Sequence, residues 1–233
     1  MEQFFSSYLG YIILTGIASV IGMIVSGVLQ AKFRKYSQIG ISNRMSGREV
    51  AEAMLRHFGV KGVQIVEGQG MLTDHYNPAS KTVSLSPAIY NGQTIMAAAV
   101  AAHECGHAVQ HATSYPMLQL RSNLVPIVQV ASGVQQYLFM AVLLFASTNP
   151  ALLLACIAAF AVTTLFSIIT LPVEFDASKR ALVWLNSTGI LRGKEYDGAK
   201  DALTWAAMTY VAAALAALVS LIYLILRYMN TRN

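Results

Sequence analysis

Three long stretches without a charged side chain constrain this chain more than any other feature. No Asp, Glu, Lys or Arg occurs in residues 3–31, 122–173 or 202–226. A helix needs about 20 apolar residues to cross a membrane, so the first and last stretches each predict one crossing, at residues 8–29 and 206–226. The chain is 55% hydrophobic and only 12% charged, about half the charged fraction of a typical soluble domain. An ordinary soluble domain and a disordered chain are therefore both excluded.

The middle stretch is too long for one helix, and Ser-Thr-Asn-Pro at 147–150 interrupts it with turn-forming residues. It therefore predicts two helices, at residues 126–146 and 151–171, joined by a short outer turn. The helix at 8–29 is expected to be a retained anchor rather than a signal peptide. No positive charge precedes it, and its apolar run is too long for a signal peptide.

Lysine and arginine gather in two of the segments between these crossings. Of the sixteen in the chain, nine lie in residues 32–125 and five in residues 172–205, and the expected outer turn has none. Cytoplasmic loops are enriched in Lys and Arg, so both segments are predicted to face the cytoplasm. In a chain this apolar, the net charge of +5 indicates orientation in a lipid bilayer and not binding to nucleic acid.

The segment after the first crossing predicts a small α+β arrangement. Ser46 and Glu49 fit a capping box that begins an amphipathic helix at 46–59. Three β-like runs follow, at 63–66, 72–76 and 82–86, and the Asn-Pro-Ala-Ser turn between the last two predicts a hairpin. We expect the run at 82–86 to form the outer edge of the hairpin and to be available for pairing with a peptide. A long helix is then predicted from about residue 93 to about 114, ending before a proline.

This long helix contains the sequence His-Glu-Cys-Gly-His at 103–107. His103 and His107 are four residues apart, so both imidazoles project from one face of the helix and can share one metal ion. Glu104 lies about 100° around the helix, within reach of a water molecule on that ion. The pattern indicates a zinc site, with Glu104 as the general base. Cys105 is expected to point away from the metal and to serve packing.

A catalytic zinc ion needs a third protein ligand and an open position for water. The metzincin pattern is absent, because it would place glycine and histidine where Gln110 and Thr113 stand. His111 is two turns from His103, too far to share one ligand shell, and is expected to contact the substrate or a ligand. Acids at a membrane boundary are candidates for function. Glu174 is the favoured third ligand, and Asp176 is the alternative ligand or a partner that holds a ligand imidazole.

These motifs resemble those of the bacterial YugP-like neutral zinc metallopeptidases, a small family of membrane-bound gluzincins. The resemblance covers nearly the whole chain and is most specific in Ala-His-Glu-Cys-Gly-His-Ala at 102–108 and Leu-Pro-Val-Glu-Phe-Asp-Ala-Ser at 171–178. It implies a multi-pass protein of the bacterial plasma membrane, with zinc on His103, His107 and Glu174. A looser similarity to HtpX-type proteases would place an aspartate at position 178, where this chain has serine. The residue that orients a ligand histidine is therefore left open.

The sequence predicts a zinc-dependent endopeptidase that hydrolyses a peptide or a membrane-protein substrate by means of one Zn²⁺ ion, with its active site in the cytoplasm. Glu104 would take a proton from the attacking water and pass it to the leaving amine. The oxyanion needs a further donor. The alternative is a non-enzymatic zinc-binding scaffold or sensor, which would have no need of Glu104 beside a ligand histidine. The candidates for the further donor are His75, Tyr76, His111 and Arg180.

The predicted fold class is a mainly α membrane protein with four transmembrane helices and a small α+β, zincin-like cytoplasmic portion that contains the active helix and a short hairpin or sheet. Five segments are expected along the chain. They are an N-terminal anchor at 1–31, a catalytic segment at 32–125, two transmembrane helices at 126–171, a segment that supplies the third ligand at 172–205, and a fourth helix with a short tail at 206–233.

Overall fold

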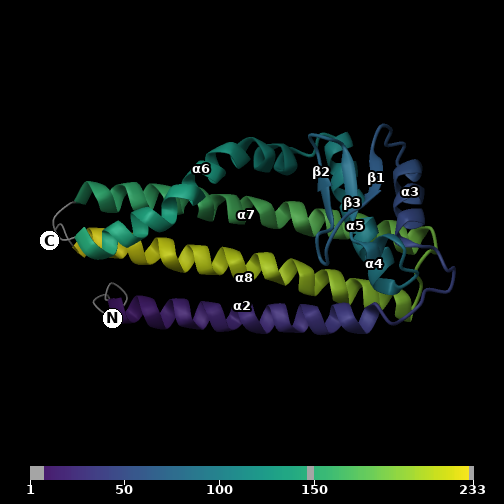
Figure 1. Ribbon diagram of the computed structural model, residues 1–233, viewed down its shortest axis with the longest axis horizontal. Helices are drawn as coiled ribbons and strands as arrows, with labels where there is room; N and C mark the ends of the chain where they lie inside the picture. Colours follow the sequence, from purple (N-terminus) through teal and green to yellow (C-terminus); the bar gives the residue numbers. More distant parts are fainter. Residues whose placement is uncertain (1–7, 146–149, 231–233) are drawn as a thin grey trace. The chain divides into compact units, whose positions relative to one another are not determined.

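The computed structural model describes residues 8–145 and 150–230 (Figure 1). Within them the fold is mainly helical, with one three-stranded sheet. The predicted outer turn at 147–150 falls largely on residues 146–149, outside the described residues. The elements are α2 (Tyr8–Tyr36), α3 (Gly47–His57), β1 (Gln64–Glu67), β2 (His75–Asn77), β3 (Thr82–Leu85), α4 (Pro87–Tyr90), α5 (Ile95–Ala112), α6 (Pro116–Phe145), α7 (Pro150–Ser187) and α8 (Lys194–Asn230).

Four of the described helices, α2, α6, α7 and α8, are long and apolar enough to cross a membrane. This confirms the four helices predicted from the uncharged stretches. Each extends beyond its stretch, most clearly α7, which continues past Leu171 to Ser187. The helix can continue because residues 173 to 186 include many that favour helix. A helix does not have to end where the apolar stretch of the sequence ends.

The chain divides into two compact units. The first contains residues 1–25, 120–171 and 209–233, and the second contains residues 26–119 and 172–208. The first unit has an apolar cluster around Cys156, Phe160 and Tyr223. In that unit the rings of Tyr11 and Tyr223 stack with their centroids 4.2 Å apart.

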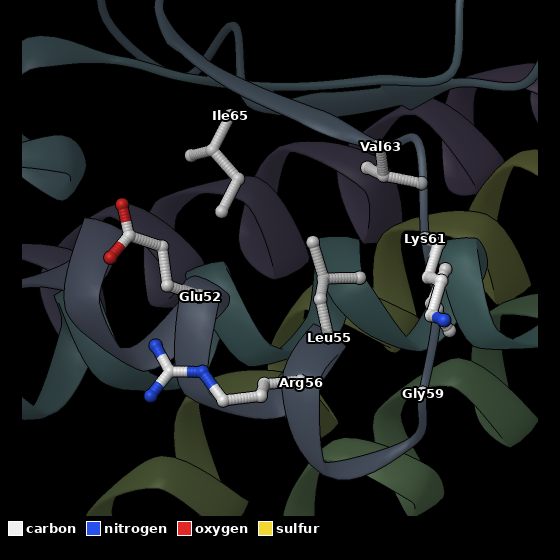
Figure 2. Close-up of a pocket in the computed structure, with 8 residues that line it drawn as sticks. Glu52, Leu55, Arg56, Gly59, Lys61, Val63 and Ile65 are labelled. Atoms are coloured by element: carbon white, nitrogen blue, oxygen red, sulfur yellow. The ribbon is translucent and has the colours of Figure 1, made fainter.

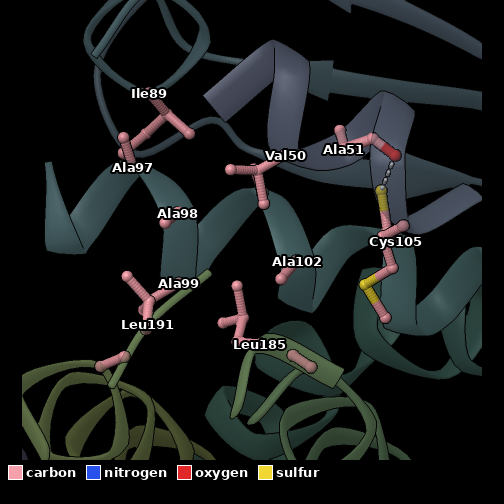
Figure 3. Packing of buried hydrophobic residues seen from close by; sticks show 14 of the residues in the cluster. Val50, Ala51, Ile89, Ala97, Ala98, Ala99, Ala102, Cys105, Leu185 and Leu191 are labelled. Atoms are coloured by element: carbon pink, nitrogen blue, oxygen red, sulfur yellow. Dashed lines mark hydrogen bonds between the residues drawn. The ribbon is translucent and has the colours of Figure 1, made fainter. Parts of the chain in front are cut away.

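The core of the second unit forms around α5. The alanine-rich helix packs against α3 and against the end of α7, and Figure 3 shows Ala98, Ala102 and Cys105 of α5 among these contacts. Small side chains allow close helix packing, which excludes water from the interior. The Cys105 thiol lies 3.6 Å from the carbonyl oxygen of Ala51, so Cys105 faces α3, in agreement with its predicted packing role.

The capping box of α3 is confirmed. The hydroxyl of Ser46 accepts from the amide of Glu49, and the Glu49 carboxylate accepts from the amide of Ser46. These bonds satisfy two of the backbone donors that a helix start leaves free. The hydrogen bonds that Ser46 donates, first from its backbone amide, are stronger to the ionised carboxylate, and the pKa of Glu49 is therefore lowered.

The hairpin is also confirmed, but the expected edge is wrong. β3 lies in the middle of the sheet, antiparallel to β2 and parallel to β1. The strand β2 is shorter than predicted, because Leu72 has a left-handed backbone (φ 57°) that leaves the extended conformation before the strand begins. The free edges of the sheet therefore belong to β1 and β2, and β3 has no edge to offer.

Candidate metal centre

Two histidines of α5 form one side of the candidate metal centre. The helix begins after Thr94, whose hydroxyl accepts from the amide of Ala97 and caps the first turn. One turn separates His103 from His107, so both project from the same face, and their ring centroids are 4.8 Å apart. His107 is buried and His103 is nearly so, which holds both imidazoles away from bulk water.

The third side comes from α7, where Glu174 lies two residues after Pro172. Its Oε2 atom lies 3.4 Å from Nε2 of His103 and 3.6 Å from Nε2 of His107. One ligand atom from each residue falls within 4.8 Å of the others, and this is the group of His, Cys, Asp or Glu side chains that could hold a metal among residues 8–145 and 150–230. Segments far apart in the sequence thus meet at one point.

The chemistry of these three residues fits a zinc ion. Oε2 of Glu174 is fully buried and accepts no hydrogen bond from the described residues, a costly arrangement for a carboxylate oxygen that has no cation beside it. Ligand atoms about 2.0–2.1 Å from a tetrahedral zinc ion stand about 3.4 Å from one another, and the Glu174–histidine distances are close to this value. Two imidazoles and one carboxylate are a common ligand set of catalytic zinc.

Each of the two histidines has a hydrogen-bond partner on Nδ1, the ring nitrogen that does not face Glu174. The Ser178 hydroxyl lies 3.1 Å from Nδ1 of His103, and Oε1 of Gln110 lies 3.0 Å from Nδ1 of His107. Such partners fix the orientation of metal-bound imidazoles. In both cases Nε2 is left facing Glu174.

The acids around His107 make its surroundings electrostatically negative. Burial, the largest single influence, lowers the pKa of His107, but Glu174 and Glu104 together outweigh it, and the pKa is raised. An environment that favours a proton on this ring also favours a metal cation beside it. Glu104 is itself buried, and its carboxylate accepts no hydrogen bond from the part of the chain that the structure describes.

Asp176 does not join the cluster that Glu174 forms with the histidines. Its Oδ2 accepts from Nε of Arg180 at 2.5 Å and from Nε2 of Gln110 at 2.8 Å. The Arg180 guanidinium also lies over the ring of Tyr115, 5.6 Å from its centroid. The structure therefore places Arg180 beside Asp176 and Tyr115.

The remaining predicted residues lie on β2 and at the end of α5. The Tyr76 hydroxyl and Nδ1 of His111 are 2.8 Å apart and form one hydrogen bond. His75 is exposed, and its Nδ1 lies 2.7 Å from the carbonyl oxygen of Thr73. Of the four donors considered from the sequence, Tyr76 and His111 therefore form one pair, whereas His75 and Arg180 have other partners.

The sequence reasoning missed two residues at this centre. Gln110 appeared only as a mismatch to the metzincin pattern, although it stands three residues after His107 and so shares its helix face. Ser178 appeared only as a missing aspartate. It stands four residues after Glu174, where it reaches the neighbouring histidine. Both could have been found by examining the positions three and four residues away from His107 and from Glu174, because such positions share a helix face.

A separate pocket of about 380 Å³ lies between α3 and β1 (Figure 2). Its lining includes the apolar side chains of Leu55, Val63 and Ile65 and the charged side chains of Glu52 and Arg56. No histidine or cysteine lines this pocket. It therefore lacks the groups that the metal centre brings together.

Comparison with known proteins agrees with this geometry. Residues 11–229 match the family model described as "Putative neutral zinc metallopeptidase". The chain belongs to this family. It is also 41% identical, over 205 residues, to "Putative membrane protease YugP" of Bacillus subtilis, a match that covers 88% of this chain and 90% of that protein. No solved structure matches the chain significantly. The description of the family names zinc, and the name of the relative describes a membrane protein, in keeping with the four long apolar helices of this chain.

Proposed function

We propose that this protein is a membrane-embedded zinc endopeptidase of the gluzincin type, with a zincin-like catalytic portion. The observation that carries the proposal is the convergence of His103, His107 and Glu174, with a buried carboxylate oxygen that no hydrogen bond from the described residues satisfies. The membership of the chain in a family of zinc metallopeptidases supports the same reading.

His103, His107 and Glu174 would hold the zinc ion. When bound, zinc supplies a water molecule of lowered pKa and polarises the scissile carbonyl group. Glu104 follows His103 directly in α5 and has no hydrogen-bond partner for its carboxylate among the described residues, so its carboxylate is free to act as a base. It accepts a proton from the attacking water and returns it to the nitrogen of the leaving amine.

The tetrahedral oxyanion requires a donor from the protein in addition. The Tyr76–His111 pair is the best candidate that the structure offers, because its hydrogen bond sets a phenol and an imidazole beside the last turn of α5. In this pair Tyr76 is half-buried, and burial raises the pKa of its hydroxyl. A hydroxyl that stays protonated at neutral pH remains able to donate.

We further propose that the metal centre faces the cytoplasm of a bacterial cell, with α2, α6, α7 and α8 in the plasma membrane. The bias of lysine and arginine toward residues 32–125 and 172–205 supports this orientation. The five segments predicted from the sequence follow from the same reading. A substrate that reaches this site is a peptide or a membrane protein with an extended segment in the cytoplasm.

Glu104→Gln tests the function directly. The amide cannot accept the proton, but both imidazoles remain, so zinc content should stay at the wild-type level and proteolysis should be lost. New N-terminal peptides would be compared by proteomics in cells that express wild type or Glu104→Gln, with Glu52→Gln on the surface of α3 as the matched control. A zinc-binding scaffold or sensor would give identical peptides in all three strains.

A further inference from the structure

The side chain of Gln110 is the most completely enclosed polar group beside the metal centre. It is fully buried on α5, one turn beyond His107. Its Nε2 donates to the carbonyl oxygen of Val173 at 2.8 Å and to Oδ2 of Asp176 at 2.8 Å, and its Oε1 lies 3.0 Å from Nδ1 of His107. This one amide therefore connects α5 with the part of α7 that carries Glu174.

The two acceptors on α7 determine which way the amide points. Val173 and Asp176 present only oxygen atoms, so the NH₂ group of Gln110 must face them, and Oε1 must face His107. An amide oxygen only accepts, so Nδ1 of His107 must carry a proton. In the neutral ring the lone pair is then on Nε2, the atom 3.6 Å from Oε2 of Glu174.

We propose that Gln110 is a positioning residue that fixes the tautomer and the ring orientation of His107, so that Nε2 is free to bind the metal. Its significance for zinc rests on the proposed function. Ser178 cannot make the same selection for His103, because a hydroxyl can either donate or accept.

Asp176 acts through Gln110 and not on a histidine. Its Oδ2 receives hydrogen bonds from Gln110 and from Arg180, which together hold the carboxylate in place. A carboxylate paired in this way locks the Gln110 amide in the orientation that His107 requires. In this proposal Asp176 neither binds the metal nor contacts an imidazole. It orients Gln110, which in turn orients His107.

The first experiment observes the tautomer in the metal-free wild-type protein. The chain has five histidines, and two-bond ¹H–¹⁵N spectra of ring-labelled histidine distinguish Nδ1–H from Nε2–H. The His107 signals would be assigned by their absence in His107→Asn. In the neutral ring we expect the proton on Nδ1, and a proton on Nε2 would overturn the proposal. This measurement requires no zinc, no substrate and no Gln110 variant.

The second experiment measures zinc affinity by competition with a fluorescent chelator. Gln110→Met keeps the length of the side chain but has no oxygen acceptor, so zinc should bind about 10–100-fold more weakly. The control is Thr113→Val at the C-terminal cap of α5, since the Thr113 hydroxyl donates only to backbone carbonyl groups of that helix.

One outcome of the second experiment would contradict the proposal, namely that Gln110→Met binds zinc within twofold of wild type. Melting of the metal-free proteins checks the fold, and if Gln110→Met does not fold, the wild-type tautomer decides.

A double variant tests the role of Asp176. If Asp176 acts through Gln110, then Asp176→Asn should weaken zinc binding in the wild type and have little further effect in Gln110→Met. Additive losses would refute this pathway. None of these measurements uses proteolysis. A finding that the protein cleaves no substrate would therefore contradict the proposed function but would not affect this inference about Gln110.

Discussion

Gly106 of α5 lies directly against the backbone of Ala177 in α7. A Cβ atom at position 106 would stand 2.6 Å from the carbonyl oxygen of Ala177 and 3.1 Å from its Cα. Backbone atoms on a helix cannot swing aside as a flexible side chain can. Gly106 therefore permits the close approach of the two helices that brings Glu174 to His103 and His107.

Gly106→Ala should separate α5 from α7. The overpacked contact should destabilise the metal-free protein by about 1–3 kcal/mol and should weaken zinc binding, because Glu174 moves with α7. Thermal melting and chelator competition measure the two effects. The matched control is Gly133→Ala in α6, where a Cβ would meet nothing within 4 Å. Equal behaviour of the two alanine variants would show that the contact at Gly106 does not set the helix separation.

Glu174 and Asp176 should differ sharply in their effect on metal content. Glu174→Ala removes a ligand oxygen and should leave the purified protein with little zinc. Asp176→Ala removes only a partner of Gln110, and its loss of affinity should be roughly tenfold. Elemental analysis of both variants, purified in parallel, compares them. Full occupancy in Glu174→Ala, with loss in Asp176→Ala, would move the third ligand to Asp176.

The proposed orientation predicts where an added cysteine can be labelled. Ser80 is exposed in the turn before β3, so Ser80→Cys should resist a membrane-impermeant maleimide in intact cells and react after lysis. The natural cysteines should stay silent in the folded protein, because both are buried and burial raises the pKa of the Cys105 thiol. Wild type is therefore a sufficient control, and labelling in intact cells would invert the orientation.

Because β3 lies in the middle of the sheet, it has no free edge for a substrate, and we now expect a substrate to pair with β2 instead. Its free edge can accept a peptide as an added strand, and β2 lies beside α5 in the second unit. Successive amides on a strand point to opposite sides. Of His75→Pro and Tyr76→Pro, one should therefore disturb the pairing with β3, and the other should raise KM and leave zinc content unchanged.

Kinetics and zinc content of both proline variants, with Tyr76→Phe as a control for the lost hydroxyl, decide this point. Unchanged KM in both would remove the support for strand addition. Loss of zinc in both variants would also remove this support. It would mean that both amides are needed for the fold, so that neither is available to pair with a substrate.

Local patterns of the sequence predicted much of this structure. The uncharged stretches located the four long helices, the capping box located the start of α3, and the four-residue spacing of His103 and His107 placed both on one helix face. Each of these depends on residues within one or two helical turns. They were predictable because neighbours along the chain are sufficient to determine them.

Relationships between distant segments were not predictable in this way. The parallel pairing of β1 with β3 reverses which strand forms an edge, and no residue in either strand encodes the order by itself. The contact between Gln110 and Val173 likewise depends on the approach of α5 to α7. A polar residue that bonds across segments looks the same in sequence as one exposed to water.

The proposed metal ligands are divided between α5 and α7, and this division has a consequence for how the protein is made. A nascent chain that ends before residue 174 already carries both imidazoles and Glu104, but not the carboxylate that completes the set. The ribosome must first synthesise α6 and the apolar part of α7, two of the helices suited to cross a membrane. Under the proposed function, an unfinished chain would lack the third ligand, and hydrolytic capacity would arise only after these two helices have been synthesised.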